Sequence, residues 1–124
     1  MNKSQALYNF WSSFGLEAYD QFTVPTGSGL PDFPYITYEV SEDEIDYPVL
    51  LTASLWYSGT SWEAVEAKAQ QNAERIKRMN AIKLDNGYMT ITSASPFARR
   101  MDDPNDGGIR RIVLNVTVEY FTEY

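Results

Sequence analysis

The fold is decided near the end of the chain, by the stretch Arg111-Ile112-Val113-Leu114-Asn115-Val116-Thr117-Val118-Glu119-Tyr120-Phe121. Its even-numbered positions are all apolar, whereas polar residues occupy most of its odd-numbered positions. Alternation with a period of two is typical of a β-strand that turns one side towards the core. Because this predicted strand is longer than the usual five or six residues or so, we expect it to extend beyond the core.

Three further segments predict strands. Tyr47 to Tyr57 alternates in the same way and gives a second long strand, and Tyr35 to Val40 is rich in residues that favour strands. Ile82 to Ser95 alternates more weakly and indicates a short strand, a turn at Asn86-Gly87 and a further strand.

Two segments have helical spacing. From Asn2 to Phe14, apolar residues recur at i, i+3, i+4 and i+7, and Asn2 with Gln5 can cap the start while Gly15 can end the helix. The apolar residues are Leu7, Phe10, Trp11 and Phe14. A second helix is predicted from a capping box at Thr60-Ser61-Trp62-Glu63 to about Met79.

These elements predict one α+β domain over residues 1–124, in the order α-β-β-α-β-β. We expect an antiparallel sheet of about four strands with both helices packed on one face. Tyr19 to Pro34, which contains several Pro and Gly residues, is expected to be a surface loop.

Composition excludes several classes of function. The chain has no His and no Cys, so Ser-His-Asp and Cys-His catalysis and thiolate metal sites are excluded. A net charge of −7 argues against nonspecific binding to DNA, because that affinity comes from Lys and Arg. No apolar run approaches the roughly 20 residues that span a bilayer, which predicts a soluble protein. We expect neither catalysis nor a cofactor.

The remaining candidate sites have plainer interpretations. Glu42, Asp43, Glu44 and Asp46 could supply a carboxylate pair for a hydrolase, but adjacent acids on a turn are better explained as a solvated face. Asp102 to Gly107 begins like a calcium loop, but Pro104 and Val113 occupy positions where ligands are required. Thr26 to Gly29 lacks the Lys of a phosphate-binding loop.

Ser95 to Gly108 is expected to be a long polar and basic loop that carries Phe97, Arg99, Arg100 and Met101. Phe, Arg and Met are enriched in the cores of interfaces, so these four residues are the predicted interface. A passive connection remains the alternative at this point. Trp56 or Trp62 could instead line a ligand pocket, although an apolar residue in a helical stripe is usually core.

Four segments together resemble small tail-completion proteins of long-tailed bacteriophages, which are also called tail terminators. The segments are Leu7-Tyr8-Asn9-Phe10-Trp11, Phe33-Pro34-Tyr35-Ile36-Thr37-Tyr38, Leu55-Trp56-Tyr57 before Thr60-Ser61-Trp62, and Arg110-Arg111-Ile112-Val113-Leu114-Asn115-Val116. The resemblance covers most of the chain in order and size.

The resemblance implies a structural protein of the virion tail that is assembled in the host cytoplasm. The family forms a ring, usually of six subunits, that ends polymerisation of the tail tube and meets the neck, or head-completion, proteins. Its expected partners are therefore copies of itself, the tail tube protein and a neck protein, while DNA passes through the ring without specific binding. The alternatives are another head–tail joining or tail-tube subunit, and a small carboxylate-dependent hydrolase.

Overall fold

The computed structural model describes residues 1–24, 31–40, 48–78, 81–101 and 107–122. Along the chain these residues form α1 (Lys3–Ser12), β1 (Glu17–Asp20), β2 (Tyr35–Tyr38), β3 (Val49–Ser58), α2 (Glu63–Arg78), β4 (Ile82–Leu84), β5 (Gly87–Met101) and β6 (Ile109–Thr122). Neither of the two described helices is long and apolar enough to cross a membrane.

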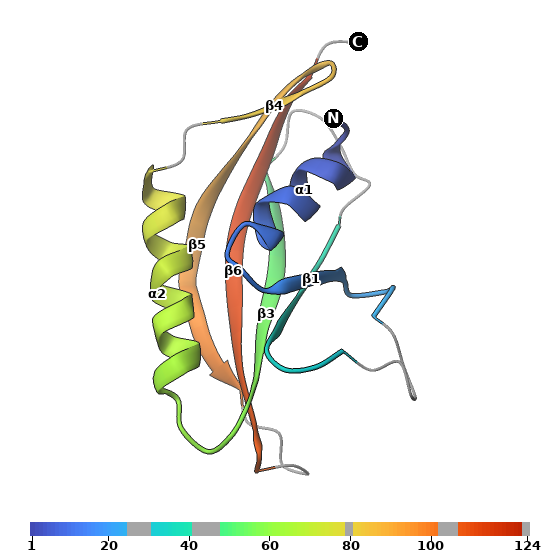
Figure 1. The fold of residues 1–124 in the computed structure, drawn as a ribbon. Coiled ribbons are helices and arrows are strands. Elements are labelled where there is room, and N and C mark those ends of the chain that lie inside the picture. Colours follow the sequence, from blue (N-terminus) through green and yellow to red (C-terminus); the bar gives the residue numbers. More distant parts are fainter. Residues whose placement is uncertain (25–30, 41–47, 79–80, 102–106, 123–124) are drawn as a thin grey trace.

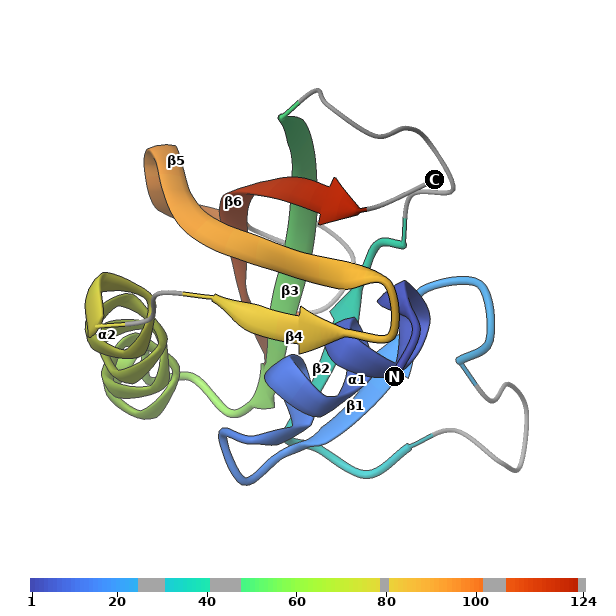
Figure 2. The same cartoon turned by 90° about the horizontal axis from the view of Figure 1, so that it is seen from above.

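The predicted sheet of about four antiparallel strands with both helices on one face is wrong, and so is the predicted order. The sheet has six strands in the order β1-β2-β3-β6-β5-β4, and it is mixed because β1 pairs with β2 in parallel. It curls into a half-barrel, with α1 inside the curve and α2 alongside β5 (Figures 1 and 2). A strand as short as β1, with only Ala18 buried, gives too little alternation to be recognised in a sequence that continues into a stretch rich in Pro and Gly.

The expected loop from Ser95 to Gly108 is also wrong over its first half. β5 continues to Met101 and pairs with β6 on both sides of an irregularity between Ser93 and Ala98. Within this irregularity the carbonyl oxygen of Pro96 accepts a hydrogen bond from Asn115 Nδ2 at 2.9 Å. Proline in a strand is tolerated at such bulges, so Pro96 does not end the strand as the sequence suggested.

Helix α1 is as its spacing predicted. Asn2 Oδ1 accepts the backbone N–H of Gln5, and Gln5 Oε1 accepts that of Asn2, so the capping box is confirmed. Gly15 follows the helix with a φ of 85°, a conformation that other residues rarely adopt. The buried face of α1 fills the curve of the sheet.

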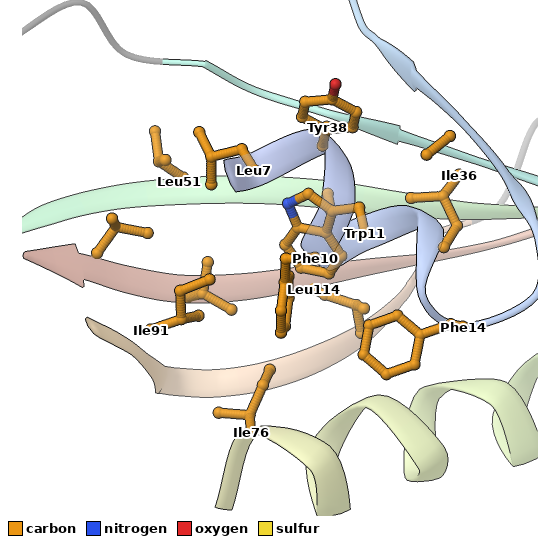
Figure 3. Packing of buried hydrophobic residues seen from close by; sticks show 14 of the residues in the cluster. Leu7, Phe10, Trp11, Phe14, Ile36, Tyr38, Leu51, Ile76, Ile91 and Leu114 are labelled. Atoms are coloured by element: carbon orange, nitrogen blue, oxygen red, sulfur yellow. The ribbon is translucent and has the colours of Figure 1, made fainter. Parts of the chain in front are cut away.

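Side chains of α1 form the centre of the core. Leu7, Phe10 and Trp11 are at most 3% exposed and lie between the strands, near Leu114 of β6 and Tyr38 of β2 (Figure 3). The rings of Phe10 and Trp11 meet edge to face with centroids 4.8 Å apart, a geometry that aromatic pairs favour.

Helix α2 begins at Glu63, two residues after the start that a capping box at Thr60 predicts. Ser61 Oγ accepts the backbone N–H of Glu63 at 3.1 Å, where a box closed by Thr60 was expected. The helix buries Val65, Ala69 and Ile76 against the sheet. Lys77 and Arg78 lie in its last turn, where positive charge complements the helix dipole.

Candidate assembly surface

The alternation that buries the even-numbered residues of β6 turns its odd-numbered residues to the other side of the sheet, here called the outer face. Strand pairing brings one residue from each of five strands into a continuous line across this face. The line, here called the outer row, consists of Glu17, Tyr35, Trp56, Arg111 and Met101. Each member lies directly opposite the next one on the neighbouring strand.

Aromatic rings cluster at one end of the outer row. The rings of Tyr35 and Trp56 are stacked, with centroids 6.1 Å apart and an interplanar angle of 16°. Phe33 and Tyr19 add rings at 5.3 and 6.1 Å from that of Tyr35. Partial burial in this cluster raises the pKa of the Tyr35 hydroxyl, and the neighbouring Tyr19 adds to the effect. The Tyr35 hydroxyl therefore stays neutral at physiological pH and is able to donate a hydrogen bond.

Arg111 lies between Trp56 and Met101 in the outer row and is held by contacts with Trp56 and Ser54. Its guanidinium carbon is 4.5 Å from the centroid of the Trp56 ring, within the range of a cation–π interaction. Its Nε and Nη2 donate hydrogen bonds of 3.1 and 3.0 Å to Ser54 Oγ. Burial lowers the pKa of the guanidinium, which nevertheless stays charged. A fixed, half-buried arginine over tryptophan is a rigid element of the outer face.

The outer face also carries large exposed apolar side chains. Leu50 of β3 is 62% exposed, and Met101 and Phe121 are 38% and 41% exposed. Tyr88 of β5 stacks on Phe121 of β6 with centroids 5.2 Å apart. The buried residues of both described helices belong to the core cluster, to which none of these exposed side chains belongs.

The four residues of the predicted interface all lie on the distal half of β5, but the structure divides them between two sides. Arg99 pairs with Val113, and Met101 pairs with Arg111 and belongs to the outer row. Arg100 points towards α2 and forms an ion pair with Glu66. Phe97 is half-buried against the core. The predicted cluster is therefore not one patch, and its interface role remains a prediction.

The ring of Trp62, which was considered above for a ligand pocket, contacts two arginines of the same chain. The guanidinium carbons of Arg100 and Arg110 lie 4.8 and 5.2 Å from its ring centroid. Arg110 is fixed in turn, because its Nε and Nη2 donate to the carbonyl oxygen of Thr60 at 3.2 and 2.9 Å. Trp56 is likewise occupied by Arg111 and Tyr35. These contacts favour a structural role for both tryptophans.

Several residues weighed in the sequence lie outside the described residues. They are Thr26, Gly27, Ser28 and Gly29, the acids Glu42, Asp43, Glu44 and Asp46, and Asp102, Asp103, Pro104, Asn105 and Asp106 of the calcium-like segment. Among the residues that the structure does describe, no group of three or more acidic, His or Cys side chains is placed to hold a metal ion.

Sequence reasoning missed the outer row. It considered Trp56 only for a ligand pocket and gave Arg111 no role, because the partner of each strand was unknown. A signal was available in the pattern itself: Tyr35, Trp56 and Arg111 stand at positions that alternate with buried residues. Large aromatic and arginine side chains on the solvent side of several strands indicate a contact surface.

No family model matches the chain, and no curated protein matches it significantly.

Proposed function

We propose that this protein is a structural assembly subunit, and specifically a tail terminator of a long-tailed bacteriophage. The observation that carries the proposal is the outer face, where the outer row joins Tyr35, Trp56, Arg111 and Met101 across the sheet. Tyr, Trp, Met and Arg are enriched in interface cores, and Tyr, Trp and Arg are also enriched in energetic hot spots. An assembly surface accounts for their presence outside the core.

The contacts within the row favour binding over catalysis. Trp56 Nε1 donates to Thr37 Oγ1 at 2.9 Å, and Arg111 is held by Ser54, so the polar tips of both side chains are already satisfied by the fold. A partner would therefore meet the apolar flanks of a rigid surface. Preorganised side chains lose little entropy on binding, which increases affinity.

The specific assignment rests on the resemblance to tail terminators. In that role the subunit forms a ring, of six copies in the usual case, that ends the tail tube and meets the tube and neck proteins. The net charge of −7 supports a ring through which DNA passes, because an acidic wall repels the phosphate backbone. The virion tail is the location that follows from this proposal.

Light scattering on the purified protein, with negative-stain images of protein and of tails, tests the proposal. The expected result is a closed ring, formed by the free protein or on the end of tail tubes. A chain that stays monomeric at all concentrations and is absent from purified tails would refute it.

Substitutions on the outer face test the observation itself. Met101→Glu or Leu50→Glu should weaken binding to a ring neighbour or to tails, because each places a charge on an exposed apolar position of this face. Tyr8→Glu is the matched control, since Tyr8 is also exposed but belongs to α1. Equal losses in all three variants would indicate that the outer face has no special role.

A further inference from the structure

A phenylalanine projects from a hydrogen-bonded turn at one edge of the sheet. Phe22 is 84% exposed, the highest value among the large hydrophobic side chains of the described residues. The turn that presents it is closed by Asp20, whose carboxylate accepts the backbone N–H of Phe22 at 3.0 Å. The carbonyl oxygen of Asp20 accepts the backbone N–H of Thr23 at 2.9 Å and its hydroxyl at 3.2 Å. Asp20 thereby holds the backbone that carries the exposed ring.

A groove of about 400 Å³ lies on the other side of the molecule, between α2 and the distal half of β5. Its apolar lining includes the buried Ala69 and Ile112 and the half-buried Ala73 and Phe97. The segment that follows β1 and the helix α2 lie at opposite sides of the molecule in both views (Figures 1 and 2). A projection and an apolar groove on opposite sides are the arrangement that a head-to-tail contact between identical subunits requires.

The two features also lie at the two open edges of one sheet. Phe22 follows β1, which is an edge strand, and the groove runs beside β5, whose far edge is covered by β4 only at Gly87–Met89. Exposed edges favour unwanted pairing unless they are covered. A contact that brings the β1 edge of one copy to the β5 edge of the next would cover both.

Charge complements shape at this contact. The sequence from Glu17 to Asp32 contains three acids and no Lys or Arg. At the groove, Arg100 pairs with Glu66, and the adjacent Arg99, on the outer side of β5, has no ion-pair partner among the described residues. An acidic segment and a positive charge beside the groove attract each other, and such complementarity favours one register and orientation.

From these observations we propose that Phe22 of one subunit inserts into the groove between α2 and β5 of a second copy of this chain. The inference rests on the proposed ring and names the contact that closes it. Repeated around a closed ring, each subunit would supply one Phe22 and one groove.

Disulfide trapping tests the contact directly, because the chain has no cysteine of its own. Phe22→Cys protein is mixed with Gln70→Cys protein, since Gln70 is exposed and lines the groove, and the mixture is treated with a mild oxidant. The expected product is a covalent heterodimer within the ring fraction. The control mixture pairs Phe22→Cys with Tyr8→Cys, whose exposed position on α1 lies outside the groove and should not cross-link.

A second measurement needs no cross-link. Phe22→Ala should require at least a tenfold higher protein concentration to assemble, while Phe22→Leu retains part of the affinity and circular dichroism shows an unchanged fold. An 84% exposed side chain contributes little to the folded subunit, so a loss of assembly reports on the contact.

The outcomes separate this inference from the proposed function. Suppose that the parent protein forms rings, that Phe22→Ala assembles at the same concentration, and that the cysteine pair cross-links no better than the control. This result overturns the inference about Phe22 and leaves the proposed ring intact. A parent protein that never assembles overturns both.

Discussion

Trp56 and Arg111 occupy directly opposed positions on β3 and β6, and the Arg111 guanidinium carbon lies 4.5 Å from the centroid of the Trp56 ring. The pair joins residues that are far apart in the sequence at the middle of the outer row. Its geometry explains how a charged side chain is held half-buried on a surface rich in aromatic residues. The cation faces a ring, and its nitrogen atoms donate to Ser54.

Arg111→Ala should lower the free energy of unfolding by about 1–2 kcal/mol, since it removes a cation–π contact and hydrogen bonds to Ser54. Arg111→Lys keeps the charge but loses the planar fork, so about half of the loss should remain. Denaturant midpoints of the three proteins check this. A lysine variant as weak as the alanine variant would indicate that the charge above Trp56 contributes nothing.

The two neighbouring arginines of β5 should behave differently when reversed in charge. Arg99→Glu should impair assembly and leave stability within about 0.5 kcal/mol, because Arg99 is exposed and has no ion-pair partner among the described residues. Arg100→Glu should also lower stability, because it removes the contact with Trp62 and places a second acid beside Glu66. The double variant should therefore assemble worst.

Sedimentation measures assembly in these variants and thermal unfolding measures the fold. The interface prediction for β5 fails if Arg99→Glu assembles as well as the parent at both low and moderate salt.

Duplex DNA should not bind appreciably at about 150 mM salt, where phosphate contacts are already weakened. The net charge of −7 is the reason, although Arg99, Arg100, Arg110 and Arg111 lie together at one end of β5 and β6. Three of them are engaged by Glu66, Thr60 or Ser54. A mobility shift assay gives the answer, and tight binding that weakens steeply with salt would show that this end acts as a phosphate-binding patch.

Local features of the fold could be predicted from the sequence, and long-range ones could not. Helix α1 follows from the spacing of Leu7, Phe10 and Trp11 and from the capping pair Asn2 and Gln5. These signals lie close together in the sequence, because a helix is made of local contacts. The alternation of β6 likewise predicts which of its residues are buried.

The curled, mixed sheet depends on which strands meet, and strand order is not written in any local pattern. β3 pairs with β6 across more than fifty residues of chain, and β5 passes Pro96 through an irregularity that the sequence does not mark. The outer row follows from those pairings. Each member could be recognised by itself as a large side chain on the solvent side of its strand. Their alignment in one row follows only from the register in which the strands pair.

Tyrosines in and around the core should make the fold sensitive to high pH. Burial raises the pKa of Tyr38 above its ordinary value of 10.0, and Asp20 and Tyr8 add to the effect. The folded state thus holds a proton that the unfolded state releases, so stability is fully present below pH 10 and falls as pH rises through the folded pKa. Chemical denaturation from pH 8 upward should show the fall, and Tyr38→Phe should reduce it. An identical pH profile in the variant would mean that Tyr38 does not titrate with unfolding.

Asn72 of α2 offers a route to a more stable subunit. It is fully buried, and its Nδ2 donates to the carbonyl oxygen of Lys68 at 2.7 Å, but its Oδ1 has no donor among the described residues. A buried acceptor without a partner costs about 1–3 kcal/mol, whereas a leucine of similar shape carries no such group. Asn72→Leu should therefore raise the free energy of unfolding by about 1 kcal/mol.

Gln71→Leu, at an exposed position of the same helix, is the control and should change the free energy of unfolding by less than about 0.5 kcal/mol. Urea denaturation gives the free energy of unfolding of the three proteins, which are compared when that free energy falls equally steeply with urea concentration. A clear loss of stability in Asn72→Leu would contradict this expectation, because it would mean that the hydrogen bonds of the amide, to Lys68 or to an ordered water molecule, outweigh the cost of an unpaired acceptor.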